Sequence, residues 1–183
     1  MDRRDRDKRV QRTRADILGS FNDLALRRRY DDIQVADVIA GAGVGRSTFY
    51  EHFRNKDDVL AGALTGILSV LADACTDAAN PAALAHIVEH FREHRALVRQ
   101  MLADPARVQI THHLADQVAA RLRGRALTIP LALAASLIAE SALGLVRAWL
   151  DRVEPCSSTD LAAALSRSGC ALAESLTERP AKT

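Results

Sequence analysis

The sequence predicts an all-α protein, and both composition and periodicity favour this fold class. Apolar residues make up 48% of the 183 residues and charged residues 26%, which is enough for a buried core and a solvated surface. Alanine and leucine dominate, whereas the 9 glycines, 5 prolines and sparse β-branched runs offer little material for strands. Apolar residues also recur with the 3.6-residue period of amphipathic helices along most of the chain.

The positive charge is concentrated at the N-terminus. The first 14 residues hold three acids and seven cations, namely Arg3, Arg4, Arg6, Lys8, Arg9, Arg12 and Arg14. Residues 61–183 hold 12 Lys or Arg and 12 Asp or Glu, a net charge of zero. A basic arm on a neutral body is typical of a chain that meets nucleic-acid phosphate at one end, although a solvated tail has the same composition.

The first predicted helix covers about residues 12–28, directly after the basic arm. Ile17, Phe21 and Leu24 lie on one face of the helical period, and polar residues occupy the other face. Tyr30 and the two aspartates that follow it break the helix. We therefore expect an amphipathic helix that packs its apolar face on whatever follows.

Two short helices are predicted next, over about residues 35–42 and 46–53. Gly43 ends the first of them, because glycine accepts the positive φ of a helix C-terminus. Phe49 and Phe53 form a one-turn pair on the second. Helices of about two turns are unstable alone, so this pair needs the first helix as a platform. The sequence therefore predicts a three-helix unit with a tight glycine turn.

The remaining chain predicts a helical bundle. Its helices are expected over about residues 56–79, 82–94, 95–103, 108–122, 130–152 and 158–176. We expect two domains: residues 1–58 form the basic arm and helix-turn-helix, and residues 59–183 a regulatory and dimerisation domain. The uncharged run at residues 126–139 is 14 residues long and contains Pro130, so it suits a buried helix better than a membrane span.

The outward side of the 46–53 helix is rich in hydrogen-bond donors. Its polar side chains are Arg46, Ser47, Thr48, Tyr50 and His52, with Glu51 as the one acid. A helix with this surface can enter the major groove of DNA, which is about 12 Å wide. Lys56 stands where a cation is unfavourable for the dipole of the next helix unless phosphate occupies the same place. The pattern therefore predicts a DNA-binding helix-turn-helix.

These residues also carry a family resemblance. Residues 35–60, and especially Gly43-Val-Gly-Arg-Ser-Thr-Phe-Tyr-Glu-His-Phe53 followed by Asn55-Lys56-Asp57, resemble the DNA-binding segment of the TetR family of bacterial repressors. The resemblance covers about residues 12–60. The later helices match the regulatory domain of that family only in number, order and length.

The resemblance implies a homodimer that reads a palindromic double-stranded operator. By position, Arg46, Ser47 and Thr48 would lie against bases and neighbouring phosphates, and Tyr50, His52 and Lys56 would hold backbone phosphates. The sequence departs from the family at Gln34, where Ser or Thr usually precedes the second helix. Glutamine is a poor helix cap, but its amide could still reach a phosphate.

The resemblance further implies a repressor that a small organic effector releases from DNA. Candidate walls of the effector pocket are Leu64, Ile67, Leu71, Ile87, Phe91, Met101, Ile110, Leu114 and Trp149. Residues of these types more often belong to the plain core than to a ligand site. No cofactor and no enzymatic activity are expected, and the charged N-terminus, which lacks an apolar stretch, predicts a cytoplasmic protein without a secretory signal.

Two alternatives remain open. His86, His90 and His94 share one helical face at one-turn spacing, which is compatible with zinc, copper or nickel binding and hence with a metal-sensing regulator. A polar, solvated face explains the same spacing. A small helical enzyme that uses these histidines is the other alternative, although the sequence offers it no nucleophile–base pair and no paired-carboxylate motif.

The last two predicted helices are apolar on more than one face. The apolar residues are Ala134, Ala135, Leu137, Ile138, Ala142 and Leu145 on the first helix and Leu161, Ala164, Leu165, Ala171 and Leu172 on the second. A purely intramolecular bundle would leave part of this surface exposed. We therefore expect a four-helix interface with the same pair of helices from a second subunit.

Overall fold

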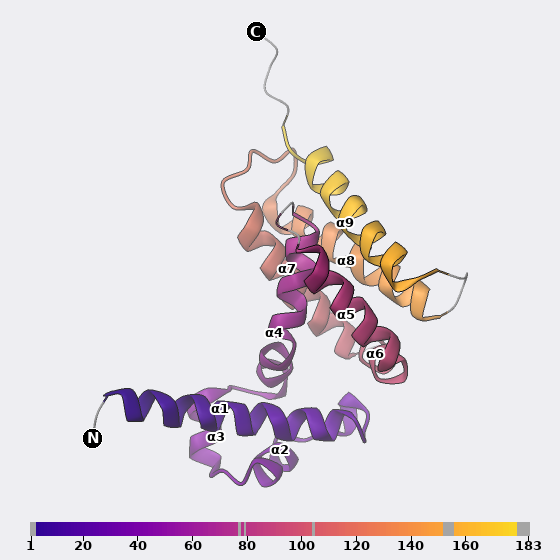
Figure 1. The fold of residues 1–183 in the computed structure, drawn as a ribbon. Coiled ribbons are helices and arrows are strands. Elements are labelled where there is room, and N and C mark those ends of the chain that lie inside the picture. Colours follow the sequence, from indigo (N-terminus) through magenta and orange to yellow (C-terminus); the bar gives the residue numbers. More distant parts are fainter. Residues whose placement is uncertain (1–2, 77, 79, 104, 152–155, 179–183) are drawn as a thin grey trace. The chain divides into compact units, whose positions relative to one another are not determined.

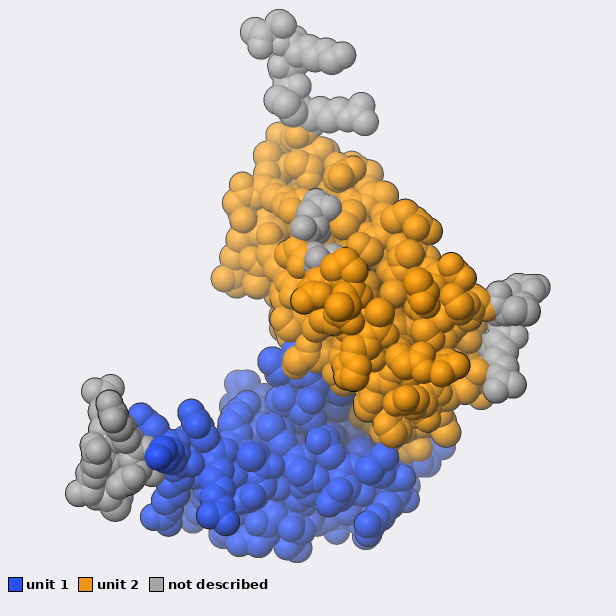
Figure 2. Space-filling model, in the orientation of Figure 1, with its two compact units in different colours: residues 1–65 blue, residues 66–183 orange. Residues whose placement is uncertain are grey.

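The computed structural model describes residues 3–76, 78, 80–103, 105–151 and 156–178. The chain divides into two compact units, residues 1–65 and residues 66–183 (Figure 2). The all-α prediction is confirmed, since the regular structure of the described residues is helical apart from an isolated bridge between Leu127 and Thr177. The division between the units falls inside one helix, α4 (Lys56–Ala74).

The first unit contains three helices and the beginning of α4 (Figure 1). They are α1 (Arg3–Ala25), α2 (Val35–Ala42) and α3 (Arg46–His52), with a short 3-10 turn, η1 (Tyr30–Asp32), between α1 and α2. The prediction that the first helix begins near residue 12 was wrong. The basic arm continues the helix because arginine, lysine and glutamine are good helix formers and neither glycine nor proline interrupts residues 3–18.

The core of the first unit joins α1 to the two short helices. Ile17 and Phe21 of α1 and Val38 of α2 are almost fully buried. Close packing of α1 on α2 is visible at Gly41, where an added Cβ would lie 2.4 Å from the Ser20 hydroxyl oxygen. That hydroxyl donates a hydrogen bond to the Val38 carbonyl, at 2.9 Å, and so ties the two helices together.

Local interactions set the ends of the short helices, and Gly43 ends α2 as predicted. Gly43 closes α2 in the left-handed conformation, with φ of 64°. At the other end of α2, the Asp37 carboxylate accepts a hydrogen bond from the backbone N–H of Gln34. The Asn55 side chain accepts from the backbone N–H of Asp58 at 2.8 Å and caps the start of α4. These interactions fix the two ends of α2 and the start of α4.

The second unit is a helical bundle. Its further helices are α5 (Pro81–Glu93), α6 (Arg95–Met101), α7 (Ala106–Leu122), α8 (Leu131–Leu150) and α9 (Ser158–Ser175). Helix α8 packs against α7 and α9, and α9 also packs against α5 (Figure 1). Helix α4 ends at Ala74, before the predicted end at Ala79, and both Ala79 and the predicted end of α8 at Arg152 lie outside the described residues.

Among the described residues, α8 is the one helix long and apolar enough to span a membrane by length and composition. Its buried face includes Ala134, Ala135, Ile138 and Val146, which pack within the bundle. In all, 39% of the apolar stretch is buried inside the unit. A core helix of a globular bundle has this composition as readily as a membrane span does.

Candidate nucleic-acid interface

Helix α3 is held by its two phenylalanines. Phe49 is completely buried and Phe53 is 3% exposed, with ring centroids 6.1 Å apart. Phe49 also makes an edge-to-face contact with Tyr50, and the two ring centroids are 5.3 Å apart. One side of α3 is therefore anchored in the core, which leaves the opposite side in a fixed orientation.

The side of α3 that faces away from the core carries the predicted DNA-binding residues. Arg46, Ser47 and Tyr50 are exposed, whereas Thr48 and His52 are half-buried. Tyr50 is 46% exposed, and the Arg46 guanidinium lies 5.7 Å from the centre of its ring. This cation–π contact places the arginine and the tyrosine beside each other on one surface.

A shallow hollow of about 360 Å³ lies between α2 and α3. Its walls are Gln34, Val35, Ala36, Ile39, Ala40, Arg46 and Tyr50. The hollow thus brings together three of the predicted site residues, Gln34, Arg46 and Tyr50. Sequence reasoning missed the contribution of Ala36 and Ala40, whose one-turn spacing on the outward face of α2 is the signal that could have revealed it.

Lys56 has an intramolecular role that the sequence did not predict. Its ammonium group donates a hydrogen bond to the Tyr30 carbonyl at 2.7 Å and lies 4.2 Å from the centre of the Tyr30 ring. The Tyr30 hydroxyl donates to the Asp57 carboxylate, and burial together with this hydrogen bond raises the pKa of Tyr30 far above its usual value. Lys56 therefore stabilises η1 against the start of α4, and its contact with phosphate stays a prediction.

The basic arm presents charge along the first turns of α1. Lys8, Arg9 and Arg12 are exposed. The Arg14 guanidinium, by contrast, lies 4.5 Å from the centre of the Phe53 ring and so packs on the end of α3. The arm is thus a helical extension of the three-helix unit.

The predicted effector-pocket residues fall into two groups. Leu71, Phe91, Met101, Ile110 and Leu114 are buried, whereas Leu64, Ile67, Ile87 and Trp149 are half-buried. Helix α7 also carries two buried polar atoms without a hydrogen-bond partner among the described residues, the Thr111 hydroxyl and Nε2 of His113. Unpaired buried polar atoms are costly, so each marks a position where a ligand atom or water would be stabilising. The pocket itself stays a prediction.

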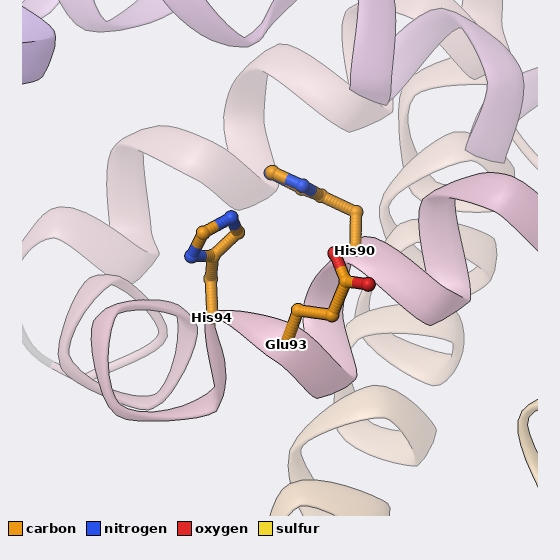
Figure 3. Close-up of side chains that lie close together, drawn as sticks. All are labelled: His90, Glu93 and His94. Carbon is orange, nitrogen blue, oxygen red and sulfur yellow. The ribbon is translucent and has the colours of Figure 1, made fainter.

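The group of candidate metal ligands on α5 differs from the predicted one in one member. His90 and His94 lie together with Glu93, and their ligand atoms are all within 4.8 Å of one another, whereas His86 is outside this group (Figure 3). The two imidazole rings are 4.4 Å apart, edge to face. Burial, followed by the charge of His94, lowers the pKa of His90. The spacing of the histidines in the sequence did not point to Glu93 as a ligand.

Comparisons with known proteins concern both units. The family of bacterial regulatory proteins, tetR family, matches residues 23–63. The uncharacterized HTH-type transcriptional regulator YxbF of Bacillus subtilis (strain 168) is 38% identical over 55 residues, which are 30% of this chain. This match spans only 14% of the length of YxbF.

Solved structures match over nearly the whole chain. The TetR transcriptional regulator from Streptococcus agalactiae 2603V is 26% identical, with a TM-score of 0.58 over 92% of this chain and 99% of its own. A TetR transcriptional regulator from Rhodococcus sp. RHA1 is 18% identical, with a TM-score of 0.51 over 91% of this chain and 98% of its own. At 18% identity, the similarity to the Rhodococcus regulator shows a shared fold alone.

Proposed function

This chain belongs to the TetR family of bacterial transcriptional regulators, and we propose that it is a repressor that binds a palindromic operator as a homodimer. A small organic molecule bound in the second unit releases the operator. The observation that carries the proposal is the division of α3 into a buried aromatic side and an exposed donor side. Packing accounts for Phe49 and Phe53 but not for the exposed Arg46, Ser47 and Tyr50.

The hollow beside α3 supports a DNA-contacting surface formed by both α2 and α3. Its apolar wall, formed by Ala36, Ile39 and Ala40, would accept a thymine methyl group or a deoxyribose. Its polar rim, formed by Gln34, Arg46 and Tyr50, would donate to base edges or phosphate oxygens. We propose that Arg46, Ser47 and Thr48 contact bases and adjoining phosphates, and that Tyr50, His52 and Lys56 contact the backbone.

The operator is tested by selecting bound sequences from a random duplex pool and titrating the selected site across salt concentrations. We expect a palindrome whose half-sites lie about one helical turn apart, with affinity falling steeply as salt rises. If no sequence is enriched and binding is weak for every duplex, sequence-specific DNA recognition is refuted.

Arg46→Ala is expected to weaken operator binding about 10- to 100-fold, because a side chain that donates to a base edge contributes roughly 1–3 kcal/mol of discrimination. Fluorescence anisotropy on the selected duplex measures the change. Arg123→Ala is the matched control, since it removes the same charge from an exposed position at the end of α7 in the second unit. Equal losses in the two variants would mean that only overall charge matters.

Most of the residues predicted for the four-helix interface, such as Ala134, Ile138 and Leu161, are instead buried within the unit. Dimerisation is therefore proposed through the exposed face of α8. Leu133 and Leu137 are 60% and 46% exposed, and Ser141 and Gly144 continue the same stripe along the helix. Glu140 at the edge of the stripe is paired with Arg107 of α7 at 2.5 Å, which neutralises its charge. A stripe of leucine and small residues suits close packing against the same helix of a second copy.

Leu137→Arg is expected to convert the dimer to a monomer, because two symmetry-related charges would be buried without partners, at a cost of several kcal/mol. Sedimentation equilibrium measures the mass, and affinity for the palindrome falls with it. Leu26→Arg, at a leucine that is 60% exposed in the first unit, is the control and should leave the mass unchanged. A dimer in both variants would place the interface elsewhere.

The effector site is proposed among the buried residues of the second unit around α7. Ile110 and Leu114 supply apolar walls, and the unpaired Thr111 hydroxyl next to Ile110 supplies a polar atom that would orient the ligand. Coupling of about 1–3 kcal/mol would make effector and operator weaken each other's binding reciprocally. Equal affinity of an effector for free and operator-bound protein would contradict this mechanism.

The remaining assignments follow from the family. Its members regulate transcription by binding DNA and are not enzymes, and we propose the same for this chain. A regulator that reads a bacterial operator works in the cytoplasm. We accordingly propose that α8 serves as a core and interface helix and not as a membrane span.

A further inference from the structure

We propose that His90, Glu93 and His94 form a binding site for a divalent transition-metal ion of the zinc class at the end of α5. The three residues occupy the last turn and the C-terminal cap of this helix. Their side chains project to the same side of that turn (Figure 3). The site is separate from the helix-turn-helix, and the proposal does not depend on operator binding.

The spacing of the ligand atoms fits a single ion. One atom from each residue lies within 4.8 Å of the other two. Two atoms bound to one tetrahedral zinc, each about 2.0–2.2 Å from the metal, lie roughly 3.3–3.6 Å apart. The cluster therefore has to close by roughly 1–1.5 Å at most, a movement that side-chain rotation supplies.

The ligand types suit zinc, and similarly copper or nickel. Two imidazoles with one carboxylate form a set that zinc sites use when a fourth position stays open to water or another ligand. The backbone keeps the histidines one turn apart, because the His94 N–H donates to the His90 carbonyl at 3.0 Å. The two rings lie beside each other, with centroids 4.4 Å apart, so that a small rotation can direct one nitrogen of each toward a common ion.

The charged residues next to the proposed site interact with other groups and not with His90, Glu93 or His94. Glu89, one turn away, is occupied by Arg92 and by the Ser158 hydroxyl. Arg95 donates to the Leu150 carbonyl. Within the described part of the chain, no hydrogen bond or ion pair engages the side chains of His90, Glu93 or His94 apart from their own contacts. The C-terminal end of α5 also favours a cation through its dipole.

His86 provides the matched control. It is an exposed histidine on the same helix, one turn before His90, but it lies outside the group. Removing His86 deletes an imidazole of the same chemistry without touching the proposed ligands.

Cys156 is exposed and is an alternative zinc ligand, so the measurements use a Cys156→Ser background and a full chain without an affinity tag.

The test is a zinc titration of the full chain in competition with a chromophoric chelator. We expect one zinc ion per chain, with affinity reduced about tenfold or more by His94→Ala and unchanged by His86→Ala. Cobalt provides a second readout, because its visible absorption reports the coordination that the same variants should alter. Far-UV circular dichroism checks that each variant is folded.

Glu93→Gln keeps the size of the side chain and removes its charge, and it also serves as the test if His94→Ala does not fold. It should weaken zinc binding by less than His94→Ala, because both imidazoles remain. The proposal is overturned if His86→Ala weakens binding as much as His94→Ala, or if neither His94→Ala nor Glu93→Gln changes the affinity.

Discussion

Replacing Phe49 with alanine is expected to unfold the helix-turn-helix and abolish operator binding. Phe49 is completely buried and contacts Tyr50 and Phe53, so its removal leaves a cavity where the outward surface of α3 is anchored. Truncation of a buried phenylalanine costs about 3–5 kcal/mol, which is a large part of the stability of a small unit. Hydrogen exchange resolved by segment should show lost protection within residues 1–65.

The second unit should keep its protection in the Phe49→Ala protein, because its core is built from other residues. Leu26→Ala is the control, since Leu26 is 60% exposed and its truncation should change the free energy of unfolding by less than about 0.5 kcal/mol. Protection lost equally in both units would show that they unfold together, contrary to the expected local effect.

Gly169→Ala is expected to destabilise the second unit by about 1–3 kcal/mol. An added Cβ at Gly169 would lie 2.6 Å from the Cα and 2.8 Å from the sulfur of Cys75. Backbone atoms cannot move aside as a flexible side chain does, so α9 would have to shift away from the residue that follows α4. Urea unfolding followed by circular dichroism measures the cost.

The opposite sign is expected for Gly66→Ala. Gly66 lies within α4, and an added Cβ would meet nothing within 4 Å. Alanine in an unobstructed helical position is favoured over glycine by about 0.5–1 kcal/mol. If both substitutions stabilise the protein, the close approach at Gly169 is wrong.

The sequence was most informative where the interactions are local. Helix periodicity, the glycine at the end of α2 and the asparagine at the start of α4 each depend on residues within one or two turns. The same holds for α3, where Phe49 and Phe53 recur one turn apart and so mark the side that faces inward. Fold class and family could therefore be predicted, because both depend on local interactions and on motif residues that lie close together in the sequence.

The start of α1 shows where local reasoning failed. The charge of the arm suggested a tail, but helix propensity continued the helix to Arg3. The histidine face shows a similar limit, since spacing alone offered His86, His90 and His94 equally. Side-chain direction at the end of α5 selected Glu93 in place of His86.

Fold class and the TetR-family motif follow from the sequence alone, because helical periods and the motif at residues 43–57 are properties of neighbouring residues. Contacts between residues that are far apart in the sequence were revealed by the folded chain. It paired Lys56 with Tyr30, 26 residues away, packed Gly169 on Cys75 and left Leu133 and Leu137 uncovered on α8. The physical reason is that such contacts depend on how helices pack in space, which the period of each helix does not specify.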